Sequence, residues 1–242
     1  MLSKIFKLGF SSYSTILNSI KHPEVLLYYA YNLSYSISSS QDYIGFVAEL
    51  FDLNEEEVKN YLPNSDTRRI LSQVLLKSMS AGLMRRPLSF KESLSLYLII
   101  RILKPKIIVE TGVGTGRSTA FILQALEDNN RGYLYSIDLN PGSGSAIPDH
   151  LKYRWFFILG ESRDVLPHLL SLLKRIDIFL HDSSHTYENM TFEFENAWRF
   201  LVKGGVLLAD NVDWNTAFKD FCIKYNLSPV CLSKKFVGVR KL

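Results

Sequence analysis

Residues 107–118 read Ile-Ile-Val-Glu-Thr-Gly-Val-Gly-Thr-Gly-Arg-Ser. A short β-branched run therefore leads straight into a turn with three glycines, and a helix-forming stretch follows. Glycines at such a turn let the backbone pass close to a ligand before a helix begins. Their GxGxG spacing differs from the GxGxxG of dinucleotide-binding folds, and no Gly-Lys-Ser or Gly-Lys-Thr follows as in a phosphate-binding loop. The stretch favours a ligand without a pyrophosphate.

The chain after residue 105 alternates short apolar runs with longer amphipathic stretches. This rhythm is typical of β-α-β units, whose parallel sheet is covered on both faces. We expect an α/β fold with a doubly wound, mostly parallel seven-stranded sheet. Strands are predicted at 107–111, 133–138, 155–159, 177–182, 205–210, 230–232 and 236–240, and helices at 116–128, 164–173, 187–201 and 214–225.

The first hundred residues are predicted to be helical. Apolar residues recur at three- and four-residue steps over residues 2–20, which is typical of an amphipathic helix. Its apolar face either packs against the rest of the chain or a second copy in a homodimer, or contacts a membrane surface. Further helices are predicted over 43–50, from Asn54 to before Pro63, over 66–79 with Asp66 as its cap, and from Ser89 to Lys104.

We therefore expect two parts, a helical cap or interaction segment over residues 1–104 and a ligand-binding domain over residues 105–242. The 242 residues, 47% of them hydrophobic and 21% charged, suit one α/β domain with a helical appendage. A net charge of +4 spread along the chain gives little support to nucleic-acid binding. No apolar run approaches the roughly 20 residues of a membrane-spanning helix. Because Cys222 and Cys231 form no CxxC motif, we expect a reducing, cytoplasmic setting.

Acidic residues follow the predicted strands with unusual regularity. They are Glu110, Asp138, Glu161, Asp182 and Asp210, the last followed by Asn211. Parallel sheets bind ligands at these carboxyl ends, so we expect the chemistry there. Asp138, placed 22 residues after Gly116, is positioned to accept hydrogen bonds from both hydroxyls of a ribose. The alternative is that Asp138 only opens the turn that begins at Asn140.

Asp182, Asp210 and Asn211 together predict a cation site. Two carboxylates and an amide oxygen suit Mg²⁺ or Ca²⁺ and are a poor set for zinc. A cation there lowers the pKa of an acceptor hydroxyl, and His185, three residues after Asp182, is placed to take the proton. Alternatively, His185 caps the helix that begins near Thr186, and Asp210 with Asn211 only ends a strand. His181 is expected to point to the other side of its strand and to be structural.

The same motifs, in the same order, resemble the class I S-adenosylmethionine-dependent methyltransferases. The resemblance rests on residues 109–116, 136–138, 160–162, 177–182 and 204–211, covers about residues 105–242, and implies an antiparallel last strand. Residues 207–212, Leu-Leu-Ala-Asp-Asn-Val, resemble the metal-binding strand end of catechol and caffeoyl-CoA O-methyltransferases. Residues 182–188, Asp-Ser-Ser-His-Thr-Tyr-Glu, are more similar to metal-dependent enzymes that methylate sugars and macrolides. The catechol group has a lysine where this chain has His185.

By this resemblance the chain methylates a hydroxyl of a small molecule or sugar, with S-adenosylmethionine as cofactor and a divalent cation. The resemblance implies that Asp182, Asp210 and Asn211 hold the cation and that His185, next to Asp182, acts as base. Two other classes stay open: a metal-independent N- or O-methyltransferase, and a non-catalytic scaffold that binds an adenosyl group or a nucleotide. The residues implied in cofactor binding are Glu110, Gly112, Gly114, Gly116, Ser118, Asp138, Glu161, Ser162 and Asp182.

Overall fold

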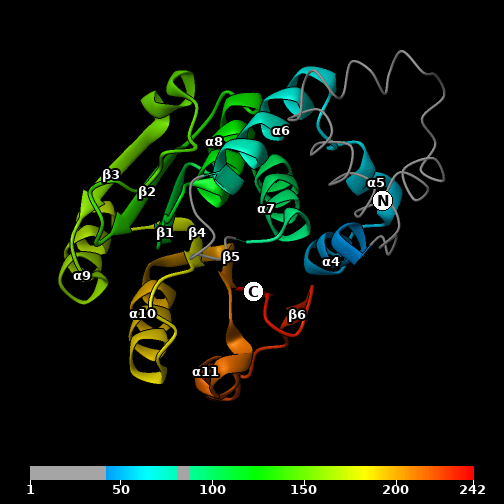
Figure 1. Ribbon diagram of the computed structural model, residues 1–242. Helices are drawn as coiled ribbons and strands as arrows, with labels where there is room; N and C mark the ends of the chain where they lie inside the picture. Colours follow the sequence, from blue (N-terminus) through cyan, green and yellow to red (C-terminus); the bar gives the residue numbers. More distant parts are fainter. Residues whose placement is uncertain (1–41, 81–87) are drawn as a thin grey trace, which may run out of the picture. The chain divides into compact units, whose positions relative to one another are not determined.

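The computed structural model describes residues 42–80 and 88–242, and seven strands in this part form a single sheet (Figure 1). The strands are β1 (Ile107–Thr111), β2 (Tyr133–Asp138), β3 (Trp155–Leu159), β4 (Ile176–His181), β5 (Leu201–Ala209), β6 (Val230–Cys231) and β7 (Val237–Arg240).

The sheet has the order β3-β2-β1-β4-β5-β7-β6. Neighbouring strands from β3 through β5 pair in parallel, whereas β7 pairs antiparallel with both β5 and β6. The direction of the strand order reverses at β1 and β4, which creates a switch point where the carboxyl ends diverge. The predicted doubly wound, mostly parallel sheet is confirmed.

Helices cover both faces of this sheet. Right-handed crossovers that run toward β3 place α8 and the 3₁₀ helix η1 on one face, and those that return place α9 and α10 on the other. Helix α7 packs on α8, and α11 packs on α10 (Figure 1). The helices are α4 (Asp42–Phe51), α5 (Glu55–Lys59), α6 (Ser65–Ser80), α7 (Phe90–Leu103), α8 (Arg117–Asp128), η1 (Asp149–Arg154), α9 (Ser162–Leu173), α10 (Tyr187–Phe200), η2 (Val212–Trp214) and α11 (Ala217–Tyr225).

Several helix ends follow the capping chemistry of the sequence. Asn54 and Ser89 each form a complete capping box, with Glu57 and Glu92 respectively. Helix α6 differs, because the Asn64 side chain accepts a hydrogen bond from the Thr67 amide at 2.9 Å. Asn64 rather than Asp66 is therefore the cap.

The starts of two elements differ from the sequence prediction by three residues or more, and smaller differences occur elsewhere. Helix α11 begins at Ala217 rather than near Trp214, because the Asn215 side chain accepts a hydrogen bond from the Ala217 amide at 2.8 Å. Strand β5 begins at Leu201 and continues through Gly204 and Gly205. The additional residues at the start of β5 pair with β4, and the pairing register shifts between Ile176 and Ile178. The pattern of apolar residues does not predict this shift.

The structure gives residues from Asp42 to Leu242 as one compact unit. Within the described ranges, none of the helices is long and apolar enough to span a membrane. The amphipathic helix predicted over residues 2–20 lies outside the described residues.

Candidate active site

A pocket of about 1090 Å³ opens at the carboxyl ends of the parallel strands, beside the switch point between β1 and β4. Glu110 and Gly116 lie behind its lining. The other residues predicted from the sequence all line it: Gly112, Gly114, Ser118, Asp138, Glu161, Ser162, Asp182, His185, Asp210 and Asn211.

The glycine-rich turn between β1 and α8 forms one wall of the pocket. Gly112 has a φ of +83°, and a Cβ there would overlap the backbone carbonyl of Asp182. A Cβ on Gly116 would come within 2.7 Å of Ile147 Cγ1. A Cβ on Gly114, where φ is +54°, would meet no atom within 4 Å. Gly112 and Gly116 therefore permit close packing of the protein, whereas Gly114 leaves open space on the ligand side.

Glu110 supports this wall from behind. Its carboxylate is fully buried and accepts hydrogen bonds from Ser118 Oγ at 2.9 Å, Thr119 Oγ1 at 2.9 Å and Ser136 Oγ at 2.8 Å. Burial raises the pKa of Glu110 to about 7, although these hydrogen bonds act in the opposite direction. The side chain thus connects β1 to β2 and to the first turn of α8, and it faces the protein interior instead of the pocket.

Asp138 ends β2 and holds the glycine-rich turn in place. Its Oδ2 accepts hydrogen bonds from the amides of Val113 at 2.8 Å and Gly114 at 3.0 Å, and its Oδ1 accepts one from the Asn140 amide at 2.8 Å. Partial burial acts to raise the pKa of Asp138, but these donors lower it overall. A carboxylate offers about four acceptor positions, so three are used and Oδ1 keeps one for a ligand.

Two more predicted residues lie beyond β3, at the start of α9. Glu161 is the N-cap residue of α9, but its side chain makes no capping hydrogen bond and is exposed at the pocket rim. The Ser162 hydroxyl donates to Asn189 Oδ1 at 3.2 Å. Both side chains can therefore contact a ligand that extends from Asp138 along this edge of the pocket.

Asp182 and Asp210 follow the neighbouring strands β4 and β5, on the other side of β1 from Asp138. Burial and the charge of Asp210 raise the pKa of Asp182 well above its ordinary value. Asp210 is 2% exposed, and its pKa is also raised by burial, which the nearby Lys235 opposes. Asp210 Oδ1 accepts no hydrogen bond from the described residues. These carboxylates carry negative charge that the surrounding protein only partly offsets.

The oxygen atoms of Asp182, Asp210 and Asn211 would form only part of the coordination shell of a divalent cation. Within residues 42–80 and 88–242, no group of three or more His, Cys, Asp and Glu side chains is arranged as a metal site. Asp182 and Asp210 supply only two such groups, to which Asn211 could add an amide oxygen. An incomplete set of oxygen ligands suits Mg²⁺, because this ion keeps several water ligands.

Lys235 lies next to Asp210. Its Nζ is 3.5 Å from Asp210 Oδ1 and 3.2 Å from Glu92 Oε2. Partial burial acts to lower the pKa of Lys235, but the two carboxylates raise it overall. The positively charged Lys235 side chain therefore lies against Asp210, one of the two aspartates.

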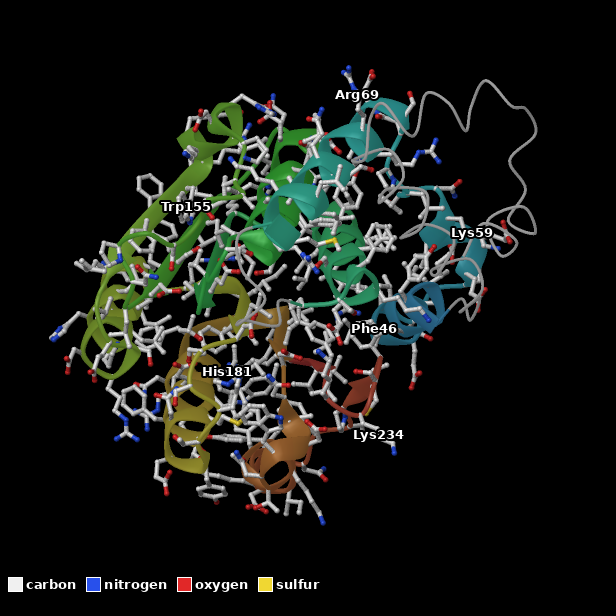
Figure 2. The ribbon with its side chains drawn as sticks, viewed as in Figure 1. Phe46, Lys59, Arg69, Trp155, His181 and Lys234 are labelled. Carbon is white, nitrogen blue, oxygen red and sulfur yellow. The ribbon has the colours of Figure 1, made fainter. Side chains whose placement is uncertain are left out.

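His185 connects the aspartate pair to a buried chain of polar side chains. Its Nε2 lies 3.0 Å from Asn211 Nδ2, and its Nδ1 lies 3.2 Å from His181 Nε2. His181 Nδ1 lies 2.6 Å from Glu193 Oε2 (Figure 2 labels His181). One set of proton positions satisfies all three contacts: Asn211 donates to His185, His185 donates to His181, and His181 donates to Glu193.

This set of protons has two consequences for the site. The Asn211 amide nitrogen faces His185, so its Oδ1 is directed elsewhere, as a cation ligand requires. Burial, followed by the influence of His181, lowers the pKa of His185 to about 4, so the ring is neutral near pH 7. The one lone pair of the neutral His185 ring is on Nε2, 4.0 Å from Asp182 Oδ1, and it accepts the hydrogen bond from Asn211.

Sequence reasoning missed His181, Glu193 and Lys235 as parts of the site. His181 is fully buried, as expected of a structural residue, yet it contacts His185 directly. A signal for Glu193 was present, because it falls on the apolar face of α10 beside Met190 and Phe194. No local pattern marks Lys235, which the β6–β7 turn brings to the pocket from far along the chain.

Comparison with known proteins finds a matching domain family. Residues 109–212 match a family described as a methyltransferase domain. A search among curated proteins found no match.

Solved structures share the fold at low sequence identity. An O-methyltransferase from Bacillus cereus in complex with S-adenosylhomocysteine is 18% identical, with a TM-score of 0.54 over 81% of this chain and 100% of its own. TomG from Streptomyces achromogenes, an O-methyltransferase of tomaymycin synthesis bound to S-adenosylmethionine, is 14% identical, with a TM-score of 0.57 over 80% and 98% of the two chains. The S-adenosylhomocysteine-bound methyltransferase PaMTH1 from Podospora anserina is 15% identical, with a TM-score of 0.55 over 77% and 94%. The chain therefore shares the fold of these S-adenosylmethionine-dependent methyltransferases, and its residues 109–212 are similar to a methyltransferase domain family.

Proposed function

We propose that this chain transfers a methyl group from S-adenosylmethionine to a hydroxyl oxygen of a small molecule, with the help of a divalent cation. One observation carries the proposal: a single pocket joins the glycine-rich turn and Asp138 to the cluster of Asp182, Asp210, Asn211 and His185. The first group suits an adenosyl cofactor, and the second suits activation of an oxygen nucleophile.

We assign different roles to the predicted residues in the cofactor half of the pocket. Gly114 leaves space for the ligand, and the free position on Asp138 Oδ1 accepts a hydrogen bond from a ribose hydroxyl. Glu161 and Ser162 contact the cofactor further along the same edge. Glu110 and Gly116 act indirectly, because they fix the shape of the turn.

Asp182, Asp210 and Asn211 would hold the cation, preferably Mg²⁺, with Ca²⁺ as the other hard candidate. Such an ion supplies Lewis-acid chemistry that lowers the pKa of an acceptor hydroxyl. His185, neutral at working pH, accepts the hydroxyl proton at Nε2, which for this step exchanges its hydrogen bond with the Asn211 amide for one with the acceptor hydroxyl. The remaining task of the pocket is to align oxygen, methyl carbon and sulfur and to exclude water.

One observation favours a metal-independent alternative. Lys235 already places a positive charge beside Asp210, so this ammonium could offset part of the negative charge without an ion. Transfer would then depend on proximity and on His185 alone. A cytoplasmic setting, a homodimer and a membrane contact through residues 2–20 stay predictions.

The first test is calorimetric titration of S-adenosylhomocysteine into the full chain, with Mg²⁺ and then with excess chelator. We expect binding in both conditions, weakened at least about tenfold by Asp138→Asn, which removes an acceptor charge. Asp149→Asn, on an exposed residue of η1, serves as the matched control. An absence of binding in the wild type would refute the cofactor assignment.

The second test is methyl transfer to a panel of small hydroxyl compounds. We expect turnover that chelator abolishes and that Asp210→Asn lowers strongly at saturating cofactor. Turnover that is unchanged by chelator and by Asp210→Asn would instead establish the metal-independent reaction.

A further inference from the structure

Lys235 is held between two buried carboxylates that belong to different parts of the fold. Glu92, in the first turn of α7, and Asp210, at the end of β5, are each 2% exposed. The backbone of Lys235 is also fixed, because its carbonyl accepts a hydrogen bond from the Val212 amide at 3.1 Å. The Ser233 hydroxyl accepts hydrogen bonds from the amides of Lys235 and Phe236, which fixes the turn. The ammonium is therefore a built feature of the pocket wall, which it lines.

The carboxyl groups around this ammonium carry more charge than it can offset when all of them are ionised. When ionised, Glu92, Asp182 and Asp210 carry three negative charges, and Lys235 supplies one positive charge. One divalent cation would neutralise the remainder. Charges that are this close together and this little exposed interact strongly. The position of the Lys235 ammonium between Glu92 and Asp210 therefore affects the affinity of Asp210 for a cation.

We propose that Lys235 sets the affinity of the aspartate pair for a divalent cation by competing for Asp210, and that Glu92 limits this competition. The ammonium offsets the Asp210 charge when no cation is bound and repels a cation that approaches. Glu92, 3.2 Å from Nζ, draws the same ammonium away from Asp210. This inference rests on the proposed function, since it assumes that Asp182, Asp210 and Asn211 form the cation site.

The proposal predicts opposite effects for two charge removals. Lys235→Gln should tighten cation binding at least about tenfold, because it removes the competing positive charge. Glu92→Gln should weaken binding by a similar factor, because Lys235 is then left with Asp210 alone. Glutamine at this position keeps the capping box of α7, so the helix start is preserved.

The measurement is Mn²⁺ binding to the full chain, followed by the electron paramagnetic resonance signal of the free ion. Lys234→Gln is the matched control, because it makes the same change one residue away on an exposed side chain (Lys234 is labelled in Figure 2). Lys235→Arg keeps the charge and should bind Mn²⁺ as the wild type does. Thermal unfolding of each variant verifies that it is folded.

The outcomes separate this proposal from the proposed function. If the wild type binds Mn²⁺ and Asp210→Asn abolishes binding, but Lys235→Gln and Glu92→Gln bind as the wild type, the cation site stands and this proposal is wrong. If Lys234→Gln tightens binding as much as Lys235→Gln, the effect is a general one of net charge and the proposal is also wrong. If neither the wild type nor Lys235→Gln binds Mn²⁺, the cation site itself is refuted.

Discussion

His185 has two chemical neighbours that suggest different roles. Its ring lies near Asp182 and Asp210, where the proposed reaction needs a base. Its Nε2 also lies 3.0 Å from Asn211 Nδ2. A base contributes to the chemical step alone, whereas a residue that orients Asn211 contributes to cation binding. The two roles therefore differ in which measured quantity changes when the ring is removed.

We predict that His185→Ala lowers kcat by about 10²- to 10⁴-fold, the range usual for a lost general base, with Mn²⁺ affinity unchanged. Single-turnover kinetics and Mn²⁺ titration on the same preparation measure both quantities. His168→Ala, an exposed histidine of α9 outside the pocket, is the control. A parallel loss of Mn²⁺ affinity would show that His185 mainly positions Asn211.

Glu110 has a different kind of importance, since its burial raises its pKa to about 7. The folded protein then binds a proton more tightly than the unfolded chain does, so its contribution to stability is present at low pH and is lost as pH rises through about 7. We predict that the wild type loses stability between about pH 4.5 and pH 7 relative to Glu110→Gln. Urea unfolding at a series of pH values measures this, with exposed Glu49→Gln as the control. Parallel curves for wild type and Glu110→Gln would contradict the assignment.

At the scale of elements, the turn between β1 and α8 combines two glycines with separate duties. Gly112 allows the turn to touch the backbone at the end of β4, whereas Gly114 borders open space. Substitution at these two positions therefore separates damage to the fold from damage to the ligand site.

We predict that Gly112→Ala destabilises the protein by about 3 kcal/mol, because a Cβ there displaces the Asp182 backbone. Gly114→Ala should cost only about 1 kcal/mol, from its positive φ, yet weaken S-adenosylhomocysteine binding at least about tenfold. Denaturant unfolding and calorimetry on both variants test this. Equal loss of stability in the two would show that Gly114 is also packed against protein.

The elements of the sheet could be predicted because their signals are local. Strands β1, β2 and β3 have the predicted bounds, since buried parallel strands appear as short apolar runs between turn residues. The capping boxes at Asn54 and Ser89 are local too. The start of α11 was missed because a side chain at Asn215 competes with the helical pattern.

The candidate site could be predicted only in part, because only some of its residues are marked by a local pattern. Asp182, Asp210 and Asn211 lie at strand ends, and the topology of a parallel sheet brings such ends together. Lys235 and Glu92 come together through the packing of the β6–β7 turn near α7, which no spacing in the sequence expresses. Specific contacts of this kind depend on tertiary structure.

At the scale of the whole molecule, helices from the first hundred residues complete one side of the sheet. Helix α4 packs on β6 and β7, where Phe46 and Phe236 make an edge contact with ring centroids 6.1 Å apart. Helix α7 packs along α8. These contacts suggest that the helical part and the sheet unfold together from Asp42 onward.

Asp128, at the end of α8, connects α6 and α7 to the sheet-forming part through polar contacts. It accepts hydrogen bonds from Tyr97 Oη at 2.6 Å and Thr67 Oγ1 at 3.0 Å, and Arg101 Nη1 lies 3.4 Å away. Three residues of α6 and α7 thus depend on a single carboxylate of the sheet-forming part. Its removal leaves several largely buried donors without their partner, which is costly.

We predict that Asp128→Ala destabilises the chain by about 2 to 4 kcal/mol while unfolding stays a single transition. Asp149→Ala, which removes a 94% exposed carboxylate paired with Lys152, should change stability by less than about 0.5 kcal/mol. Circular dichroism of the helices and tryptophan fluorescence, followed during the same denaturant titration, report on both parts. Coincident curves are expected, because α6 and α7 pack on α8 and α4 packs on β6 and β7. If Asp128→Ala separates the two curves, then α4 to α7 form a unit that folds independently, and residues 105–242 fold without them.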